Sequence, residues 1–265
     1  MIRRAWLPLA LLAGWEIGAR LGWFGSTLVP PPGEIGAAIV DWARDGVLIR
    51  DALASVGRVG AGFVLAAILG IGVGTLVALL PVVRRSLLPL LELLRPIPPI
   101  AWIPMAILWF GIGSASAVFI VCIGGFFPIM TATMHGIAGV RRETIHTARC
   151  LGARRWLTVT DVVLPAALPD ILSGLRTGLG SAWMSLIAAE LVASQSGLGY
   201  RIQLSRLFLR SDSVVAGMLV IGILGVAMSL GLHALERRLT IWNGATLGTD
   251  ATLGGRPVDR PATGG

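Results

Sequence analysis

Long apolar runs, separated by short connections that contain arginine, recur along the whole chain of 265 residues. Only 14% of the residues are charged and 55% are hydrophobic, whereas a soluble domain has about 25% charged residues. A helix that crosses a bilayer needs about 20 mostly apolar residues, because the hydrocarbon core is about 30 Å thick. The runs therefore predict an all-α, polytopic membrane protein with about six transmembrane helices.

The predicted spans have the approximate bounds 5–23, 58–80, 86–110, 115–140, 166–192 and 213–235. The first run follows Arg3 and Arg4, so it is either a cleaved signal peptide or an uncleaved first helix. Glu16 interrupts this run and no clear small-residue cleavage site follows it, which favours the uncleaved helix.

A polar stretch, residues 24–57, separates the first run from the others. Three prolines at 30–32 break the chain there, because proline lacks a backbone donor. After them, Ile35, Ile39 and Trp42 recur at helical spacing, which predicts a surface helix near the membrane.

Arginine supplies all 22 basic residues, and the formal net charge is +8. The arginines lie between apolar runs, so they indicate membrane topology rather than nucleic-acid binding. With an internal N-terminus, the internal segments contain 13 of the 22 arginines and the external segments and their borders contain 7. The positive-inside rule therefore predicts a multi-pass inner-membrane protein with both termini in the cytoplasm.

Composition and topology together divide the chain into three parts. Residues 1–51 form a first transmembrane helix and a periplasmic segment, and residues 52–238 form the main transmembrane domain. Residues 239–265 are rich in Gly, Thr and Pro, which predicts a disordered cytoplasmic tail.

The cysteines and histidines form no recognisable site. Cys122 lies in an apolar run and Cys150 in a basic loop, which is not a disulfide framework. His135, His146 and His233 lack metal-ligand spacing. We therefore predict no catalytic residue and no metal site.

Glycines spaced four residues apart lie within two of the spans. The pairs are Gly70 with Gly74, and Gly174 with Gly178. Small residues at this spacing let helix backbones approach closely in lipid. They predict tight packing within the membrane and offer a candidate dimer face.

The third span contains four prolines within residues 96–104. Proline costs about 3 kcal/mol in a helix interior, and freed carbonyls are tolerated at membrane depth only against protein or water. We therefore expect a broken helix that lines a pathway. Charged residues in spans, such as Arg176, face the interior and serve either as ion pairs that hold the bundle together or as part of that pathway. The predicted pathway residues are Glu92, Arg95, Pro96, Pro98, Pro99, Trp102 and Glu190.

The loop of residues 141–165 reads as a short helix, a stop at Gly152, a second short helix and a terminating Pro165. An apolar stripe runs through its arginines, formed by Ile145, Ala148, Leu151 and Trp156. Such a helix can lie in a groove of a cytosolic partner. The alternative is a membrane-surface helix without a partner.

This loop resembles the coupling motif of ABC importer permeases, which is Glu-Ala-Ala, three residues, Gly, nine residues, then Ile-x-Leu-Pro. The matching positions are Ala148, Gly152, Leu164 and Pro165, with Val162 in place of Ile. His146 stands in place of the Glu and Thr147 in place of the first Ala. The coupling residues that the resemblance implies are His146, Thr147, Ala148, Leu151, Gly152, Ala153, Arg154 and Pro165.

Other segments resemble the nitrate/sulfonate/taurine branch of that family, and taurine permeases most. They are residues 95–104, 108–113, 126–129, 188–191, 197–199 and 236–242, within a resemblance that covers roughly residues 28–244. The resemblance implies the type I ABC importer transmembrane fold and import of taurine or another aliphatic sulfonate. Nitrate or a thiamine precursor is the alternative solute.

The resemblance also implies the partners. They are two ATPase subunits that use ATP and Mg, a second permease subunit (a homodimer by default), and a periplasmic or lipid-anchored solute-binding protein. Independently, a P-loop needs a lysine and this chain has none. We therefore expect no enzymatic activity and no cofactor in the chain itself.

Two classes of protein remain as alternatives. A secondary transporter needs coupling-ion sites and usually an internal repeat, and the sequence shows neither clearly. A membrane-embedded enzyme needs a cluster of polar catalytic residues, whereas His135, Asp161 and Asp170 are scattered.

Overall fold

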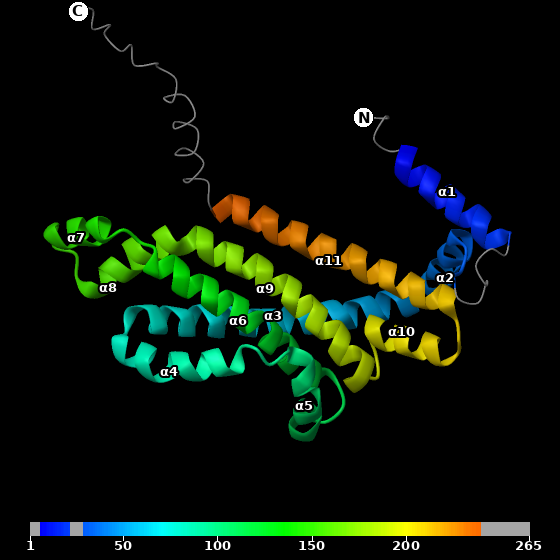
Figure 1. Cartoon of the computed structure of the whole chain (residues 1–265), viewed down its shortest axis with the longest axis horizontal. Coiled ribbons are helices and arrows are strands. Elements are labelled where there is room, and N and C mark those ends of the chain that lie inside the picture. Colours follow the sequence, from blue (N-terminus) through cyan, green and yellow to red (C-terminus); the bar gives the residue numbers. More distant parts are fainter. Residues whose placement is uncertain (1–5, 22–28, 240–265) are drawn as a thin grey trace, which may run out of the picture.

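The computed structural model describes residues 6–21 and 29–239, and throughout these ranges it contains helices and connections but no strand (Figure 1). The helices are α1 (Trp6–Arg20), α2 (Pro32–Arg44), α3 (Val47–Leu79), α4 (Pro81–Leu94), α5 (Ile103–Phe110), α6 (Ser114–Ala138), α7 (Arg142–Cys150), α8 (Arg155–Thr158), α9 (Leu164–Ala193), α10 (Leu198–Leu207) and α11 (Ser211–Leu239). The all-α prediction is confirmed. The tail predicted to be disordered lies almost wholly outside the described residues.

Four helices in the described ranges are long and apolar enough to cross a membrane. They are α3, α6, α11 and a continuous helix of 39 residues that joins α8 to α9. The bent pair of α4 and residues 99–110 makes a fifth span if it is counted as one. The predicted first span is represented by α1, which has 15 residues and is therefore about 22 Å long, shorter than the hydrocarbon core.

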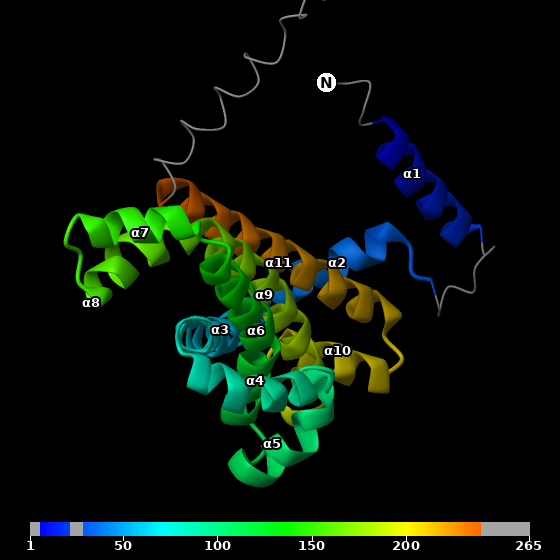
Figure 2. The same ribbon diagram turned by 60° about the vertical axis from the view of Figure 1, so that its left-hand side comes forward.

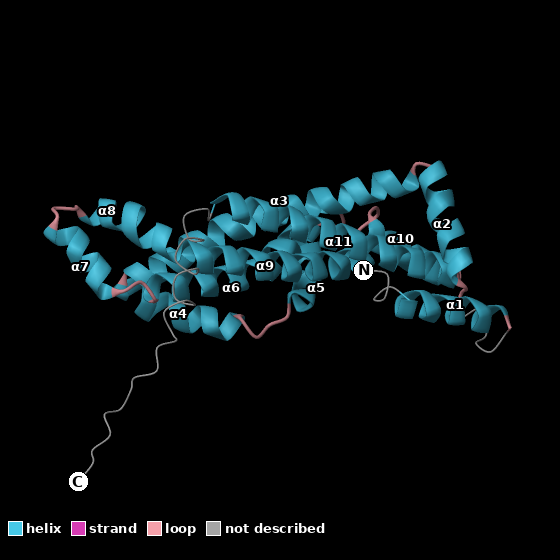
Figure 3. Ribbon diagram, turned by 90° about the horizontal axis from the view of Figure 1, so that it is seen from above, coloured by secondary structure: helices cyan, strands magenta, loops and turns pink. Residues whose placement is uncertain are grey.

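The long helices lie side by side along the long axis of the molecule, as Figures 1 and 3 both show. Helix α6 is central and packs against α3 and α9, while α11 packs against α9, α10 and α2. Figure 2 shows α7 and α8 together at one end of the bundle, and α2 and α10 near the other. We call these the α7–α8 end and the α10 end.

Glycine sets the spacing between α3 and α6. A methyl group added at Gly62 would lie 2.6 Å from Val121 Cγ1, and one added at Gly74 would lie 2.7 Å from the Met130 carbonyl oxygen. The backbones are thus closer than any side chain allows, as small residues permit in lipid. The tight packing predicted for Gly70 and Gly74 is confirmed.

The second glycine pair packs in the same way against α6. Added methyl groups at Gly174 and Gly178 would lie 2.4 Å from Ala132 Cβ and 2.6 Å from Ile129 Cγ1. All four glycines are therefore used inside this chain. The suggestion that they offer a dimer face is wrong, because α6 already covers them.

The predicted break in the third span is present. Helix α4 ends at Leu94, a 3-10 turn covers Pro99–Trp102, and the two halves meet at 91°. Pro98 and Pro99 have no N–H to continue the hydrogen-bond ladder of α4. The chain instead turns through single hydrogen bonds such as that from Ala101 N to Pro98 O (2.9 Å).

The second span begins earlier than its apolar run. Helix α3 starts at Val47, whereas the run predicted a start near Arg58. The additional turns carry Asp51, Ser55 and Arg58, whose side chains are buried. Hydropathy missed these turns because their polar groups are satisfied by partners far along the chain. The predicted surface helix, α2, buries Ile35 and Trp42 against α11.

Two glycine-to-alanine substitutions in α3 should distinguish the effect of close packing from the effect of helix propensity. Gly74→Ala places Cβ against the Met130 carbonyl and should destabilise the protein by about 1–3 kcal/mol, the usual cost of overpacking. Gly72→Ala meets nothing within 4 Å and should be neutral or stabilising, since Ala favours a helix by about 1 kcal/mol over Gly. Thermal unfolding of the detergent-solubilised variants measures both, and equal shifts would contradict the packing assignment.

Candidate functional site

The α7–α8 end carries a two-helix segment built around a glycine. Helix α7 ends at Cys150, and Gly152 has φ +87°. The Gly152 N–H donates to Arg149 O (3.0 Å) and the Ala153 N–H donates to Ala148 O (3.1 Å). This pair of hydrogen bonds is the Schellman motif, which needs a left-handed residue at that position. The left-handed helix end predicted at Gly152 is confirmed.

The apolar stripe predicted on this segment is divided by the fold. Ile145 packs toward the bundle, against the cluster that contains Val163 and Ala167. Leu151 and Trp156 point outward, with 83% and 76% of their surface exposed. Two large apolar side chains thus lie in the open at the tip of the molecule.

The other predicted coupling residues lie on the same segment, except Pro165, which lies near the start of α9. His146, Thr147 and Arg154 are exposed, and the Thr147 hydroxyl donates to Glu143 O (2.9 Å). Ala148 and Ala153 are half-buried. The structure therefore gathers the rest of the set on one exposed hairpin, and their role in coupling stays a prediction.

Pro165 does not end the helix that precedes it, contrary to the sequence expectation. A π-helical turn over Val159–Val163 joins α8 to α9, and the Leu164 N–H donates to Val159 O, five residues back. Such a turn offsets the hydrogen-bond ladder by one residue, so the missing donor of proline is accommodated near the start of α9. The outcome is one continuous helix from Arg155 to Ala193.

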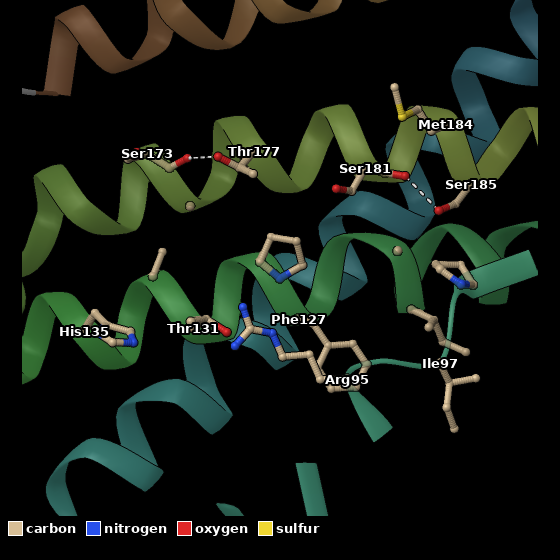
Figure 4. Close-up of a pocket in the computed structure, with 16 residues that line it drawn as sticks. Arg95, Ile97, Phe127, Thr131, His135, Ser173, Thr177, Ser181, Met184 and Ser185 are labelled. Atoms are coloured by element: carbon tan, nitrogen blue, oxygen red, sulfur yellow. Dashed lines mark hydrogen bonds between the residues drawn. The ribbon is translucent and has the colours of Figure 1, made fainter. Parts of the chain in front are cut away.

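A cavity of about 620 Å³ lies between α6, α9 and the break that follows α4 (Figure 4). Its polar side chains come from all three elements and are Arg95, Thr131, His135, Ser173, Thr177, Ser181 and Ser185. Its apolar wall includes Phe127 and Met184. The cavity is open on one side.

The predicted pathway residues are not all at this cavity. Arg95 and Pro99 line it, whereas Glu92, Pro96, Pro98, Trp102 and Glu190 are not among its lining residues. Trp102 packs against the core of α6 and α9, and no ion pair joins Glu92 to Arg95 in the described part of the chain. Sequence reasoning missed the serines and threonines of α9, although their spacing of four residues is visible in the sequence.

Glu190 lies instead in a buried polar cluster at the α10 end. The Arg58 guanidinium donates to its carboxylate (Nη1 to Oε1, 2.7 Å), as do the Ser55 hydroxyl (2.8 Å) and the Gly199 N–H (2.9 Å). Arg58 and Glu190 expose 7% and 1% of their surface. Every oxygen of the carboxylate has a donor, as a buried charge requires.

The same guanidinium fixes the connection between α9 and α10. Arg58 donates to the Ser196 carbonyl (2.7 Å) and hydroxyl (2.6 Å), and its Nε donates to Ser114 Oγ (3.1 Å). Next to it, Arg201 donates twice to Asp51 Oδ2 (2.9 and 2.8 Å). The cluster therefore ties α3, α6, α9 and α10 together.

Arg176, the other charge expected in a span, pairs with Glu236 and His233 of α11. Of the two roles expected for Arg176, the contacts agree with the ion pair that holds the bundle together, because they join α9 to α11. Within residues 6–21 and 29–239 no group of three or more His, Cys, Asp or Glu residues could hold a metal ion.

We expect removal of one partner of the buried pair to be severe. Arg58→Ala leaves the Glu190 carboxylate buried without its cation, a change that typically costs about 3–5 kcal/mol. Arg210→Ala removes an exposed ion pair with Asp212 (3.0 Å) and should cost at most about 1 kcal/mol. Thermal unfolding in detergent compares them, and a small loss for Arg58→Ala would contradict the assigned role of the cluster.

Comparisons with known proteins agree on the class of protein. The family described as "Binding-protein-dependent transport system inner membrane component" matches residues 60–241. The taurine transport system permease protein TauC of Escherichia coli (strain K12) is 39% identical over 239 residues, which cover 88% of this chain and 87% of that protein. The putative aliphatic sulfonates transport permease protein SsuC of Bacillus subtilis (strain 168) is 36% identical and covers 89% and 86%.

Two further similarities broaden the picture. The bicarbonate transport system permease protein CmpB of Synechococcus elongatus (strain PCC 7942) is 35% identical over 191 residues, 72% of this chain and 69% of that protein. An inward-facing structure of the MetNI methionine ABC transporter superposes with a TM-score of 0.65, covering 73% of this chain and 96% of that chain at 19% identity. The latter similarity concerns the fold alone.

Proposed function

The chain belongs to the family of binding-protein-dependent transport system inner membrane components, and we propose that it carries taurine or another aliphatic sulfonate across the inner membrane. It is a permease of the ABC importer type. The substrate class is supported by two relatives, a taurine permease and an aliphatic sulfonates permease, whose similarity covers more than four fifths of the chain.

The observation that carries the coupling part of the proposal is the exposed α7–α8 hairpin. Leu151 and Trp156 extend from a capped turn whose geometry depends on Gly152. Exposed apolar side chains on a short helix suit a groove in a partner. In the proposed importer this partner is the ATPase, which binds ATP and Mg, and the permease itself is not an enzyme.

The rest of the assembly follows from this assignment. In this proposal the α7–α8 end and both termini lie in the cytoplasm, and the solute-binding protein docks at the α10 end. The open side of the cavity is closed by a second permease subunit, which in the simplest case is another copy of this chain. The His146 and Thr147 departures from the coupling motif lie on the exposed surface and do not alter the turn.

One observation favours a second solute. The bicarbonate permease relative covers 72% of the chain, so a small inorganic anion is the alternative, as is nitrate; a thiamine precursor is a more distant one. A secondary transporter is the alternative of a different class.

Reconstituted transport tests the function directly. We expect proteoliposomes that contain this chain, its cognate ATPase and its loaded binding protein to take up labelled taurine only when ATP is supplied. Uptake of bicarbonate or nitrate in place of taurine would keep the permease and change the solute. Uptake without any ATPase would contradict the importer assignment and favour a secondary transporter.

The coupling hairpin is tested by two substitutions that each introduce a glutamate, one on the hairpin and one at the opposite end of the bundle. Leu151→Glu should greatly weaken binding of the ATPase, because it places a carboxylate in an apolar contact. Phe208→Glu, which changes another exposed apolar side chain at the α10 end (71% exposed), should leave that binding unchanged. Co-purification of the ATPase with each variant measures both effects, and equal losses would contradict docking at α7–α8.

The backbone requirement at Gly152 offers a second control on the hairpin. Gly152→Val should impair coupling because β-branched residues avoid positive φ, whereas Gly152→Asn should largely retain it because Asn tolerates this conformation. An added Cβ meets nothing within 4 Å there, so a loss in the Val variant reports the turn and not a steric clash within the chain.

A further inference from the structure

We propose that the cavity between α6 and α9 is a transit site for the anionic head group of the solute, with Arg95 as its cation and α9 hydroxyls as its hydrogen-bond donors. This inference rests on the proposed function, since it names the chemistry that passes through the permease.

Arg95 is a cation without a carboxylate. It caps the last turn of α4, where its N–H donates to Leu91 O (2.9 Å). Within the described residues its guanidinium has no ion-pair partner, and no Asp or Glu lines the cavity. Arg58, Arg176 and Arg201 all have carboxylates, whereas Arg95 is exposed at the open cavity without one.

Arg95 lies between the two halves of the broken third span, and this position makes the lack of a carboxylate partner significant. It lines the cavity together with Phe127 and Thr131, near the middle of α6. A charge at membrane depth costs at least about 2.5–3.5 kcal/mol, and such residues face water, protein or a transported ion. A guanidinium presents several donors in a fixed fork, which suits an oxyanion with several oxygen atoms.

A row of hydroxyls on α9 faces the same space. Ser173, Thr177, Ser181 and Ser185 are spaced four residues apart, so they extend along one helix face for about 18 Å. Figure 4 shows the row on the cavity side of α9, opposite Thr131 and His135 of α6.

Alternate hydroxyls in this row have different roles. Thr177 and Ser185 donate to the carbonyls of Ser173 and Ser181 (3.1 and 2.7 Å). The Ser173 and Ser181 hydroxyls have no protein acceptor within the described part of the chain, so their protons are available to an anion. Because these two donors lie one after the other along α9 and do not form a closed ring around one point, an anion can move from one hydroxyl to the next.

The size and strength of the site suit passage. A cavity of about 620 Å³ falls within the range of about 300–1,000 Å³ that is usual for small-molecule sites. Ile123, Phe127 and Met184 supply apolar surface for a short alkyl chain. Because a transported ion must also leave, a single cation on an open wall is more suitable than a closed charge cage.

Charge-selective labelling tests the site independently of ATP. In a background of Cys122→Ala and Cys150→Ser, Ser181→Cys is treated with 2-sulfonatoethyl methanethiosulfonate or with its trimethylammonioethyl counterpart. We expect the anionic reagent to react with Ser181→Cys faster than the cationic reagent does. We expect this preference to fall about tenfold in Arg95→Gln, the loss expected when a charge-assisted hydrogen bond is removed, and to persist in Arg95→Lys. Ser173→Cys, which is more exposed, is the second labelling position.

Two controls make the result specific. Ser229→Cys lies in the groove between α9 and α11, away from the cavity, and its reagent preference should not respond to Arg95→Gln. Arg85→Gln removes an exposed arginine from α4, the helix that ends just before Arg95. This substitution should leave labelling at Ser181→Cys unchanged. A preference that is absent, or that survives Arg95→Gln, would overturn the proposal.

Transport completes the test. Arg95→Gln should lower ATP-dependent taurine uptake about tenfold or more, with assembly of the complex intact, while Arg85→Gln should not. Anion preference in labelling without taurine transport would remove taurine as the solute and leave the anion site. Taurine transport without any labelling preference would leave the function and remove the anion site.

Discussion

The structure depends on the close approach of α3 and α9 to α6. In lipid there is no water to drive apolar faces together, so helices associate through packing and hydrogen bonds. Gly62, Gly74, Gly174 and Gly178 allow backbone contacts that a single methyl group would prevent. With these three helices fixed, the other elements have limited freedom: α11 lies along α9, and the two halves of the broken third span pack against α3 and α6.

The two ends of α9 are held in different ways. At the α10 end, Glu190 is fixed by Arg58, Ser55 and the Gly199 N–H. At the other end, α9 continues through a π-helical turn into α8 and the exposed hairpin. A continuous helix transmits displacement along its axis better than a broken one, so movement of the hairpin in the proposed importer would reach the hydroxyl row directly. The buried cluster would then serve as the fixed point of that movement.

Local signals in the sequence identified the elements whose geometry is local. Gly152 was assigned from helix-stop chemistry and the break after Leu94 from its prolines, and the structure agrees with both. The Arg58–Glu190 pair joins residues 132 positions apart, and no periodicity indicates such a partner. The early start of α3 was missed for the same reason, because its polar turns look exposed until their distant partners are placed. Pro165 was misjudged because a π-helical turn is not visible in composition.

The contrast between Arg58 and Arg95 separates structure from function within one bundle. Both are arginines beside apolar helices, and hydropathy treats them alike. Arg58 donates to Glu190, Ser114 and Ser196 and is almost fully buried, so its charge is neutralised inside the chain and a transported anion would have to displace a carboxylate. Arg95 lies on the open wall of a cavity that is lined by hydroxyls and by no acidic side chain. Its charge is therefore available to bind an anionic solute. A membrane protein retains an unneutralised charge at depth only where water or a ligand reaches it, and in this chain that condition is met where the third span breaks.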